Sequence, residues 1–492
     1  MSFSGLANQF LGHINWQKLA ENYQQQNRYK LAEKSYIYQA KTENTGIPKI
    51  PHELNLRDYQ KQAVINWLKN QGRGTLKMAT GSGKTITALA VATELYQQIG
   101  LQILLVICPF RHLVLQWAKE AEKFNLIPFL AFNSVNNWHS ELSTKLYNIN
   151  SSKTKFLTII TTNSTFISQG FQTQLPFFPE KTLIIGDEAH NLGSAKLQSL
   201  LPKTIGLRLA LSATPERYYD EHGTDALISY FGKVLQPEFT LGDAIKKKAL
   251  VSYNYYPIFV ELTEFEAKRY TQLTKKIGWE LSKDNSPHNR HLTALLVRRS
   301  RLIGTAKNKL TALKELMKER INTHSTIFYC GDGKVEYEGK TERQLEIVTR
   351  ILGKEIGYRV NIYSANTPLT ERETIKQQLE NKELQGIVSI RCLDEGIDIP
   401  SIKNAVILAS SSNPRQFIQR RGRVLRPHHS KKEANIFDMI VIPPILDRET
   451  WEIEKSLLKK EIKRFMEFAN LANNADYAKE KLFHLQNHFD VY

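Results

Sequence analysis

The stretch "MATGSGKT", from Met78 to Thr85, decides the fold of the first half of the chain. It follows the short β-like run "GTLK" and opens a helical pattern. Gly81 and Gly83 allow a tight turn whose N–H groups can face phosphate oxygens, and the start of the following helix adds partial positive charge. Lys84 can then reach the terminal phosphates of a nucleotide, and Thr85 can offer its hydroxyl to Mg²⁺. Although Met78 stands where the strict pattern has glycine, the stretch predicts a phosphate-binding loop; a glycine-rich turn before an ordinary helix is the alternative.

Apolar, β-branched runs alternate with helical patterns on both halves of the chain. In the first half these runs lie at 104–109, 157–162, 182–188 and 207–214, and in the second half at 325–330, 359–365, 386–392, 404–410 and 435–443. Continuously apolar strands that alternate with helices are typical of parallel sheets covered on both faces. The predicted fold class is therefore α/β, with one domain at 51–245 and a second at 316–446. The other segments read as helical: an N-terminal extension at 1–50, a linker and charged insert at 246–315, and a C-terminal extension at 447–492.

Composition restricts the classes of protein that fit. A chain of 492 residues is too long for one ordinary core. It has no apolar run of roughly 18 residues that could cross a membrane, and its N-terminus has no secretory pattern, so we expect a cytoplasmic protein. The three cysteines are far apart, which excludes a four-ligand zinc site and disfavours a disulfide framework. The net charge of +18 suggests a polyanionic partner; a basic protein kept soluble by its charge is the alternative.

The stretch "LIIGDEAHNL" supplies a second element of the predicted phosphate site. Its apolar strand ends in Asp187 and Glu188, and parallel sheets bind ligands at the carboxyl ends of their strands. Asp187 is placed to hold Mg²⁺ through water, and Glu188 to polarise an attacking water. Since no second histidine lies at helical spacing from His190, we expect that residue to couple the nucleotide state to neighbouring loops rather than to bind metal.

The phosphate loop, the DEAH stretch and the "SATP" of Ser212 to Pro215 follow one another in this order. Together they resemble the first RecA-like domain of the DEAH-type helicases and translocases of superfamily 2. The resemblance covers roughly 51–446 and implies two tandem RecA-like domains that bind ATP and Mg²⁺. The phosphate loop would comprise Thr80, Gly81, Ser82, Gly83, Lys84 and Thr85, with Thr85 and Asp187 at the metal.

The same resemblance assigns roles to residues around these motifs. In "LRDYQ", Arg57 and Gln60 would recognise adenine, and Gln60 has the paired donor and acceptor that the base requires. In "SATP", Ser212 and Thr214 would join His190 in coupling. Candidate nucleic-acid contacts are Arg111 and Gln116 in "CPFRHLVLQW" and Thr162 and Asn163 in "TTNS".

The second half resembles the partner domain of the same family. In "IRCLDEGIDIP", Gly396 and Asp398 would face the nucleotide, and "QRRGRVLR" matches the arginine-finger motif at Gln419, Arg423 and Arg426. The two arginines would reach across an interdomain cleft to the γ-phosphate of ATP. A basic helix face is the alternative for this stretch. Other arginines of the same stretch would face solvent or bind phosphates elsewhere, namely Arg415, Arg420 and Arg421.

The activity implied is ATP-driven movement along nucleic acid, DNA rather than RNA, in repair, restriction or phage defence. The chain shows no nuclease motif, so cutting would need a nuclease or another defence-complex subunit as partner. Arg298, Arg299, Arg301, Lys307 and Lys309 of the helical insert either lie on duplex phosphates or form a solvated face that braces the second domain. An RNA remodeller and a nucleotide-gated assembly subunit remain the alternative functions.

Overall fold

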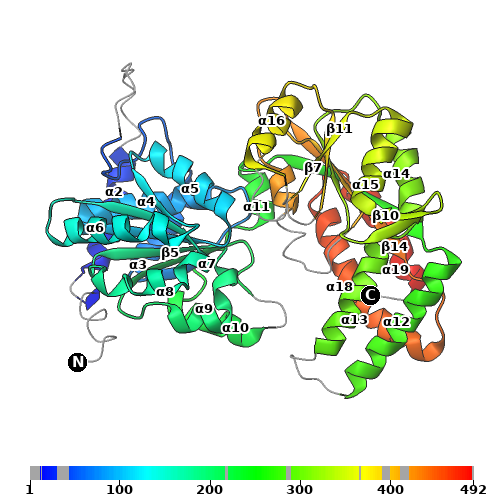
Figure 1. The fold of residues 1–492 in the computed structure, drawn as a ribbon, viewed down its shortest axis with the longest axis horizontal. Coiled ribbons are helices and arrows are strands. Elements are labelled where there is room, and N and C mark those ends of the chain that lie inside the picture. The colour runs from blue at the N-terminus through cyan, green and yellow to red at the C-terminus, as the bar shows by residue number, and fades with distance from the viewer. Residues whose placement is uncertain are drawn as a thin grey trace. The chain divides into compact units, whose positions relative to one another are not determined.

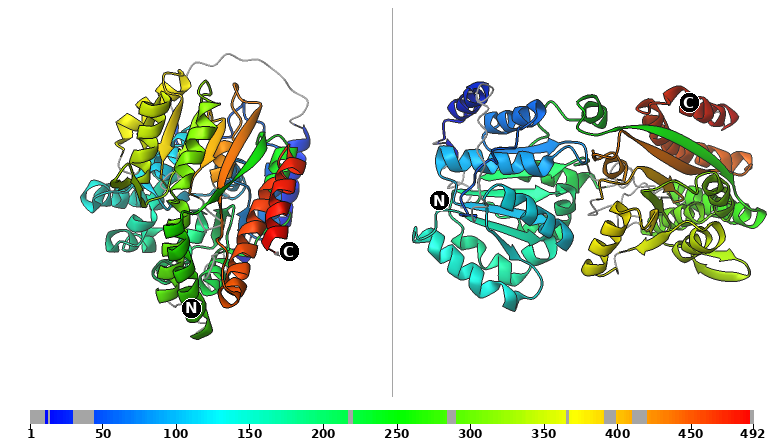
Figure 2. Two further views of the ribbon diagram at one scale, coloured as in Figure 1. Left: turned by 90° about the vertical axis from the view of Figure 1, so that its right-hand side faces the viewer. Right: turned by 90° about the horizontal axis from the view of Figure 1, so that it is seen from above.

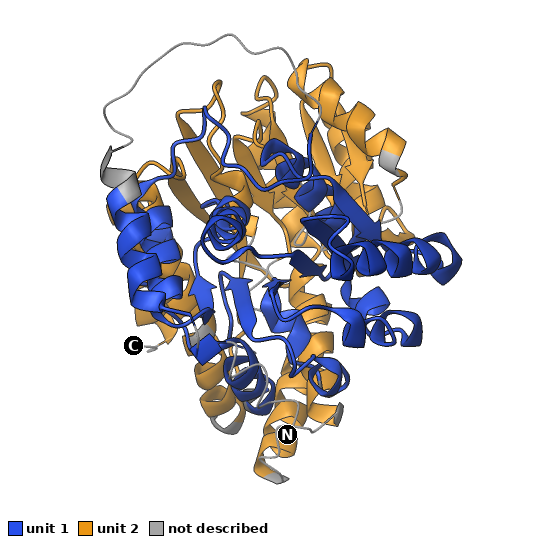
Figure 3. Ribbon diagram, turned by 90° about the vertical axis from the view of Figure 1, so that its left-hand side faces the viewer, with its two compact units in different colours: residues 1–243 blue, residues 244–492 orange. Residues whose placement is uncertain are grey.

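The computed structural model of the chain describes residues 11–12, 14–29, 44–216, 220–283, 290–364, 367–390, 399–409 and 420–489. The chain divides into two compact units, residues 1–243 and 244–492 (Figure 1 and Figure 3). Within the described ranges, no helix combines the length and the apolar character that crossing a bilayer would demand.

A six-stranded parallel sheet forms the centre of the first unit, in the order β1-β6-β5-β2-β4-β3. Its strands are β1 (Arg73–Lys77), β2 (Ile103–Cys108), β3 (Pro128–Ala131), β4 (Leu157–Thr162), β5 (Thr182–Asp187) and β6 (Leu207–Ser212). Side chains of β2 alternate between two cores, with Leu104 and Val106 in one and Ile103 and Leu105 in the other. The strand is apolar at every position because both of its faces are covered.

Helices cover both faces of this sheet (Figure 2). The core that contains Leu104 is completed by α2 (Trp16–Tyr29), α3 (Asp58–Lys69), α4 (Lys84–Ile99) and α5 (Arg111–Lys123). The core that contains Ile103 is completed by α6 (His139–Asn150), α7 (Asn163–Phe166), α8 (Gln169–Gln172), α9 (Ala195–Leu200) and α10 (Glu221–Phe231). A last helix of this half of the chain, α11 (Leu241–Lys246), spans the boundary between the units.

The second unit has a sheet of the same kind, in the order β11-β12-β8-β13-β14-β7, again with all strands parallel. Its strands are β7 (Ser252–Glu261), β8 (Thr326–Tyr329), β11 (Val360–Tyr363), β12 (Gly386–Ser389), β13 (Asn404–Ile407) and β14 (Glu433–Ile442). A separate antiparallel hairpin consists of β9 (Lys334–Tyr337) and β10 (Lys340–Arg343). The prediction of two parallel-sheet α/β domains is thus confirmed.

The helices of the second unit come from the insert, the sheet crossovers and the C-terminal extension. They are α12 (Glu264–Lys283), α13 (Arg290–Gly304), α14 (Asn308–Lys318), α15 (Gln344–Arg350), α16 (Leu369–Glu380), α18 (Arg448–Asn470) and α19 (Ala475–Phe489). A π-helical turn, Ile351–Ile356, continues α15. Leu310 and Leu313 of α14 pack with Leu345 and Val348 of α15 in the main core of this unit.

The edge strand β7 was not among the predicted strands. From Ser252 to Pro257 its residues alternate between partly and fully buried positions, and Pro257 is a residue that sheets tolerate at an edge. Asn474 covers this edge, since its side-chain oxygen accepts a bond from the Tyr255 N–H at 2.8 Å and its amide donates to the Tyr255 carbonyl at 3.0 Å. The connection between α18 and α19 therefore satisfies backbone groups that an open edge would leave exposed.

The basic insert contains two cations that are buried rather than available to a polyanion. Arg299 donates to Glu454 at 2.8 Å and to Glu461 at 3.4 Å, and its guanidinium lies 4.9 Å from the centre of the Tyr270 ring. Because these partners belong to α18 and α12, Arg299 ties three helices together. Lys309 is fully buried and donates to the Leu408 carbonyl. Of the two alternatives for the five cations, contact with duplex phosphates and a solvated bracing face, neither holds for Arg299 and Lys309, because both side chains are buried, although Arg299 does brace the helices of this unit.

Burial of Lys309 predicts a specific dependence of stability on pH. Desolvation lowers the pKa of this ammonium to about 8 from an unfolded value near 10.5. Between these values the folded protein binds fewer protons than the unfolded chain, so folding stability rises with pH. Relative to Lys309→Met, the free energy of unfolding of the natural chain should increase by about 3 kcal/mol from pH 7 to pH 10.5, as measured by urea unfolding.

Lys318→Met is the matched control, because Lys318 lies on the same helix and is exposed. That variant should differ from the natural chain by a constant amount over the same pH range. A constant difference for Lys309→Met over this pH range would contradict a lowered pKa of Lys309 in the folded protein.

Candidate nucleotide-binding site

The predicted phosphate loop is a turn between β1 and α4. Gly81 and Gly83 have φ angles of 84° and 87°, a region that favours glycine, and Gly83 is the N-cap of α4. A Cβ atom on Gly83 would lie 2.7 Å from Nε2 of Gln60. The Tyr59 hydroxyl donates to the Ser82 carbonyl at 2.6 Å, which braces the loop from α3. The left-handed backbone at position 83 therefore favours glycine, and a Cβ atom there would displace the amide of Gln60.

Gln60 connects the start of α3 to this loop. Its side chain is buried; its oxygen accepts a bond from the Arg57 N–H at 2.9 Å, and its amide donates to the Gly83 carbonyl at 3.3 Å. Each end of the amide keeps one further hydrogen-bonding position, since an amide oxygen has two lone pairs and an amide nitrogen two hydrogens. Recognition of adenine by Arg57 and Gln60 stays a prediction.

The carboxylate of Asp187 is buried at the carboxyl end of β5. One oxygen accepts a bond from Nε1 of Trp117 at 2.8 Å, and the other accepts from the N–H of Glu188 at 3.0 Å. Burial, together with the neighbouring Glu188 carboxylate, raises the pKa of Asp187 to about 6. The ammonium of Lys84 opposes this rise in pKa, so loop and carboxylate interact electrostatically.

Glu188 starts a chain of polar contacts that ends at Thr214 in the "SATP" stretch. The residue has a φ of 43°, which turns the backbone at the end of β5. Its carboxylate lies 3.6 Å from Nδ1 of His190, which is itself 3.3 Å from the hydroxyl of Ser212. The Thr214 N–H donates to that hydroxyl at 3.1 Å. The three predicted coupling residues, His190, Ser212 and Thr214, therefore contact one another in this order.

Some buried polar atoms at the same sheet edge have no hydrogen-bond partner within the described residues. Among the described residues they include the hydroxyls of Thr80 and Thr214 and one carboxylate oxygen of Glu188. Buried polar groups are normally paired, so these oxygens fit a site that a polar ligand and its water complete. No group of three acidic, histidine or cysteine side chains suited to a metal occurs in the described ranges. Magnesium held by Thr85, Asp187 and nucleotide phosphates fits this arrangement, because Mg²⁺ needs few protein carboxylates.

The four candidate nucleic-acid contacts follow the carboxyl ends of β2 and β4. Arg111 is exposed at the first position of α5, and Gln116 is partly buried on the same helix. Thr162 is buried and caps α7, since its hydroxyl accepts a bond from the Thr165 N–H at 3.2 Å. The side-chain oxygen of Asn163 is buried and has no partner in the described part of the chain. Their role in binding nucleic acid stays a prediction.

The predicted residues of the second half are only partly within the described structure. Gly396, Asp398, Gln419 and Arg415 lie outside the described residues. Arg423 and Arg426 are half-buried in the segment that begins at residue 420. Which atoms they approach in a nucleotide complex stays a prediction.

From the sequence, Arg420 and Arg421 are expected to face solvent or to bind phosphates elsewhere. In the structure both side chains are instead buried. Arg420 donates to the Ala409 carbonyl at 2.8 Å and lies over the Tyr329 ring, and Arg421 donates to Glu467 at 2.9 Å and lies over the Phe468 ring. Each is 2 % exposed. The prediction was wrong because a planar guanidinium stacks on aromatic rings, which lets arginine enter a core.

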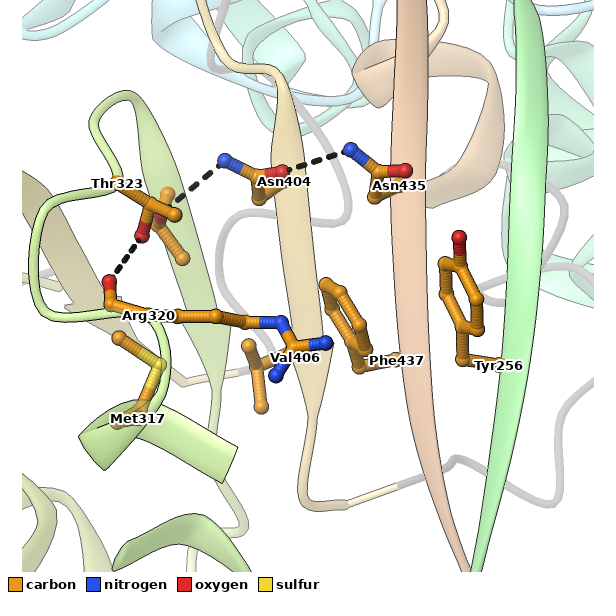
Figure 4. Close-up of a pocket in the computed structure, with 9 residues that line it drawn as sticks. Tyr256, Met317, Arg320, Thr323, Asn404, Val406, Asn435 and Phe437 are labelled. Carbon is orange, nitrogen blue, oxygen red and sulfur yellow. Dashed lines mark hydrogen bonds between the residues drawn. The ribbon is translucent and has the colours of Figure 1, made fainter. Parts of the chain in front are cut away.

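A cavity of about 230 Å³ lies in the second unit, beside the first residues of β8 and β13 (Figure 4). The Arg320 guanidinium lies 4.9 Å from the centre of the Phe437 ring. The Asn435 amide donates to the Asn404 oxygen at 3.1 Å, and the Asn404 amide donates to the His324 carbonyl. Because Thr326 and Asn404 are the first residues of their strands, the cavity lies at the amino ends of β8 and β13, whereas parallel sheets bind ligands at the carboxyl ends.

Two family descriptions match the chain, one in each half. Residues 53–217 match "Type III restriction enzyme, res subunit", and residues 308–428 match "Helicase conserved C-terminal domain". The chain is 26% identical over 438 residues to the DNA 3'-5' translocase XPB2 of Sulfurisphaera tokodaii, covering 86% of this chain and 90% of the relative. It is 25% identical to the putative DNA 3'-5' helicase Rad25 of Halobacterium salinarum, covering 76% of this chain and 52% of the relative.

Solved structures share the fold. The type ISP restriction-modification enzyme LlaBIII bound to DNA matches 85% of this chain with a TM-score of 0.55 and 20% identity, and the match spans 30% of that enzyme. The Hef helicase domain of Pyrococcus furiosus matches 82% of this chain and 98% of its own length, with a TM-score of 0.50 and 16% identity. These structural likenesses show the fold alone. The two family matches and the relative from Sulfurisphaera tokodaii show that the chain is a helicase or translocase of superfamily 2, an ATP-hydrolysing enzyme.

Proposed function

We propose that this chain is an ATP-driven translocase or helicase that acts on DNA. The observation that carries the proposal is the gathering, at one edge of the first sheet, of the phosphate loop, Asp187 with Glu188, and the residues that follow β2 and β4. A nucleotide and a nucleic-acid strand held at the same edge are close enough for the state of one to affect the other.

The first unit would hold the nucleotide through the phosphate loop and the carboxylate at the end of β5. Backbone N–H groups of the phosphate loop and the Lys84 ammonium bind phosphate oxygens, while Thr85 and Asp187 hold Mg²⁺. Bound ATP supplies the phosphoryl group that passes to water, and Mg²⁺ neutralises part of its charge. Glu188 orients the attacking water and accepts its proton. In this proposal His190, which lies 3.6 Å from the Glu188 carboxylate and 3.3 Å from the Ser212 hydroxyl, passes a change at Glu188 to Ser212.

The second unit would complete the site. In this proposal Gly396, Asp398 and Gln419 face the nucleotide, and Arg423 and Arg426 stabilise the negative charge that develops on the transferred phosphoryl group. A site shared between two units favours their closed arrangement while ATP is bound, and hydrolysis releases it. If both units hold one strand through Arg111, Gln116, Thr162, Asn163 and exposed cations of the second unit, each cycle advances the protein along that strand.

DNA is the nucleic acid that the comparisons favour. The relatives from Sulfurisphaera tokodaii and Halobacterium salinarum are named for action on DNA, and one structural neighbour was solved with DNA. A net charge of +18 suits a polyanionic strand. The match to the res-subunit family supports a place in restriction or phage defence beside a nuclease or other defence-complex subunit.

Hydrolysis measured with single-stranded DNA, duplex DNA, forked DNA and RNA side by side tests this proposal. We expect DNA to stimulate hydrolysis and the stimulation to weaken steeply with added salt, because binding releases counterions from the phosphates. Lys84→Ala serves as the control for contaminating hydrolysis, since it removes the ammonium from the phosphate loop. Stimulation by RNA alone would assign an RNA remodeller instead.

A further inference from the structure

The buried indole of Trp117 makes a contact that no motif predicts. Trp117 lies on α5 and is 1 % exposed, and its Nε1–H donates to one carboxylate oxygen of Asp187 at 2.8 Å. The other oxygen of Asp187 accepts the N–H of Glu188 at 3.0 Å. Each oxygen of this carboxylate is therefore held by a different element, one by a side chain 70 positions away in the sequence and one by the adjacent backbone.

This pair of bonds determines how the carboxylate is oriented. Rotation about the side chain of Asp187 would break the bond to Trp117, and burial makes the loss of a bond to a charged group costly. An ionised carboxylate has about four lone-pair sites on its two oxygens. The two bonds leave roughly half of these sites, in fixed directions, for a metal ion or for the water molecules bound to it.

We propose that Trp117 is a positioning residue for Mg²⁺, acting through Asp187. The proposal rests on the proposed function, in which Asp187 holds the metal. Groups that orient metal ligands through hydrogen bonds typically change metal affinity by about 10–100-fold when they are removed. The indole does not itself touch substrate or metal in this scheme; it restricts the carboxylate to the orientation that Mg²⁺ requires.

A binding measurement tests this role without depending on turnover. Mg²⁺ is titrated into the full chain with a fluorescent, non-hydrolysable ATP analogue at fixed concentration, and the Mg²⁺ concentration that gives half of the bound signal is recorded. Trp117→Phe, which keeps an aromatic ring but has no N–H, should raise this concentration by about 10–100-fold.

The matched control is Trp67→Phe. Trp67 is also buried in the first unit, and its Nε1–H also donates one bond, to the Arg208 carbonyl at 3.1 Å. Its acceptor is a backbone carbonyl between Leu207 and Leu209 of β6 rather than a catalytic carboxylate. The Mg²⁺ requirement of this variant should stay within about threefold of that of the natural chain. The control therefore distinguishes the general loss of an indole hydrogen bond from the loss of the bond to Asp187.

Trp117→His separates hydrogen bonding from packing. An imidazole can place its Nε2–H where the indole Nε1–H lies, but it fills less of the core than phenylalanine does. A positioning role predicts a Mg²⁺ requirement nearer to the natural one for histidine than for phenylalanine, whereas a packing role predicts the reverse order. Thermal unfolding of each variant identifies any variant that does not fold. If Trp117→Phe does not fold, the Mg²⁺ requirement of Trp117→His is compared with that of the natural chain.

The outcomes distinguish this inference from the proposed function. A Mg²⁺ requirement of Trp117→Phe within threefold of the natural chain, or a better result for phenylalanine than for histidine, would overturn the positioning role. Absence of Mg²⁺-dependent nucleotide binding by the natural chain would instead overturn the proposed nucleotide site.

Discussion

Arg426→Ala is expected to lower the rate of ATP hydrolysis by about 10³–10⁵-fold while ATP affinity stays within a few-fold. In the proposed function, Arg426 belongs to the second unit and acts on charge that develops only during phosphoryl transfer, whereas Lys84 and the phosphate loop bind the ground state. An interaction made only in the transition state affects turnover and spares binding. Steady-state hydrolysis with saturating DNA and titration with a fluorescent ATP analogue measure the two quantities separately.

Two further variants show what the arginine contributes. Arg343→Ala is the control, because Arg343 is exposed at the end of β10 in the same unit, and it should hydrolyse ATP at the natural rate. Arg426→Lys keeps the charge but loses the planar donor group, and it should remain strongly impaired. If Arg426→Ala hydrolysed ATP normally, Arg426 would have no role in stabilising the transferred phosphoryl group, and its assignment as an arginine finger would fail.

Glu188→Gln is expected to lower hydrolysis by about 10²–10⁴-fold and to leave ATP binding intact. The amide has the size of the carboxylate and suits the same backbone, with its φ of 43°, but it cannot accept a proton from the attacking water. Bound ATP should therefore accumulate on the variant. Hydrolysis under single-turnover conditions, beside retention of labelled ATP, measures both effects.

Glu180→Gln is the matched control, since Glu180 is an exposed carboxylate shortly before β5. Translocation along DNA should be lost with Glu188→Gln and kept with Glu180→Gln. A variant at 188 that still moved along DNA, or still performed its cellular role with ATP bound and unhydrolysed, would favour the nucleotide-gated assembly subunit over a motor.

The local geometry of the candidate site in the first unit was predictable because it depends on residues close together in the sequence. A phosphate loop needs glycines at fixed places beside Lys84, and the φ angles of Gly81 and Gly83 confirm the turn that this pattern predicts. The apolar run before Asp187 predicts a buried parallel strand, and that strand places the carboxylate at the edge of the sheet. Neither conclusion depends on knowing what packs against the motif.

Contacts between distant segments were not predictable in the same way. Trp117 reads as one more apolar residue on the buried face of a helix, and nothing near it indicates that its indole bonds to Asp187. The edge strand β7 alternates like a surface strand, and its outer edge is covered by Asn474, more than two hundred residues later. Apolar residues spaced every two positions identify a strand, and apolar residues spaced every 3.6 positions identify a helix, but neither spacing identifies the segments that pack against it.

The sequence by itself determined two parallel α/β sheets, a glycine turn before the helix that begins at Lys84, and carboxylates at the end of the fifth strand, because short-range sterics and apolar periodicity dictate these features. Only the tertiary structure decided which cations are available to a ligand. Arg299, Arg421 and Lys309 are buried by acidic, aromatic or carbonyl partners from other segments, and a charged side chain enters a core only where such partners compensate for its lost hydration.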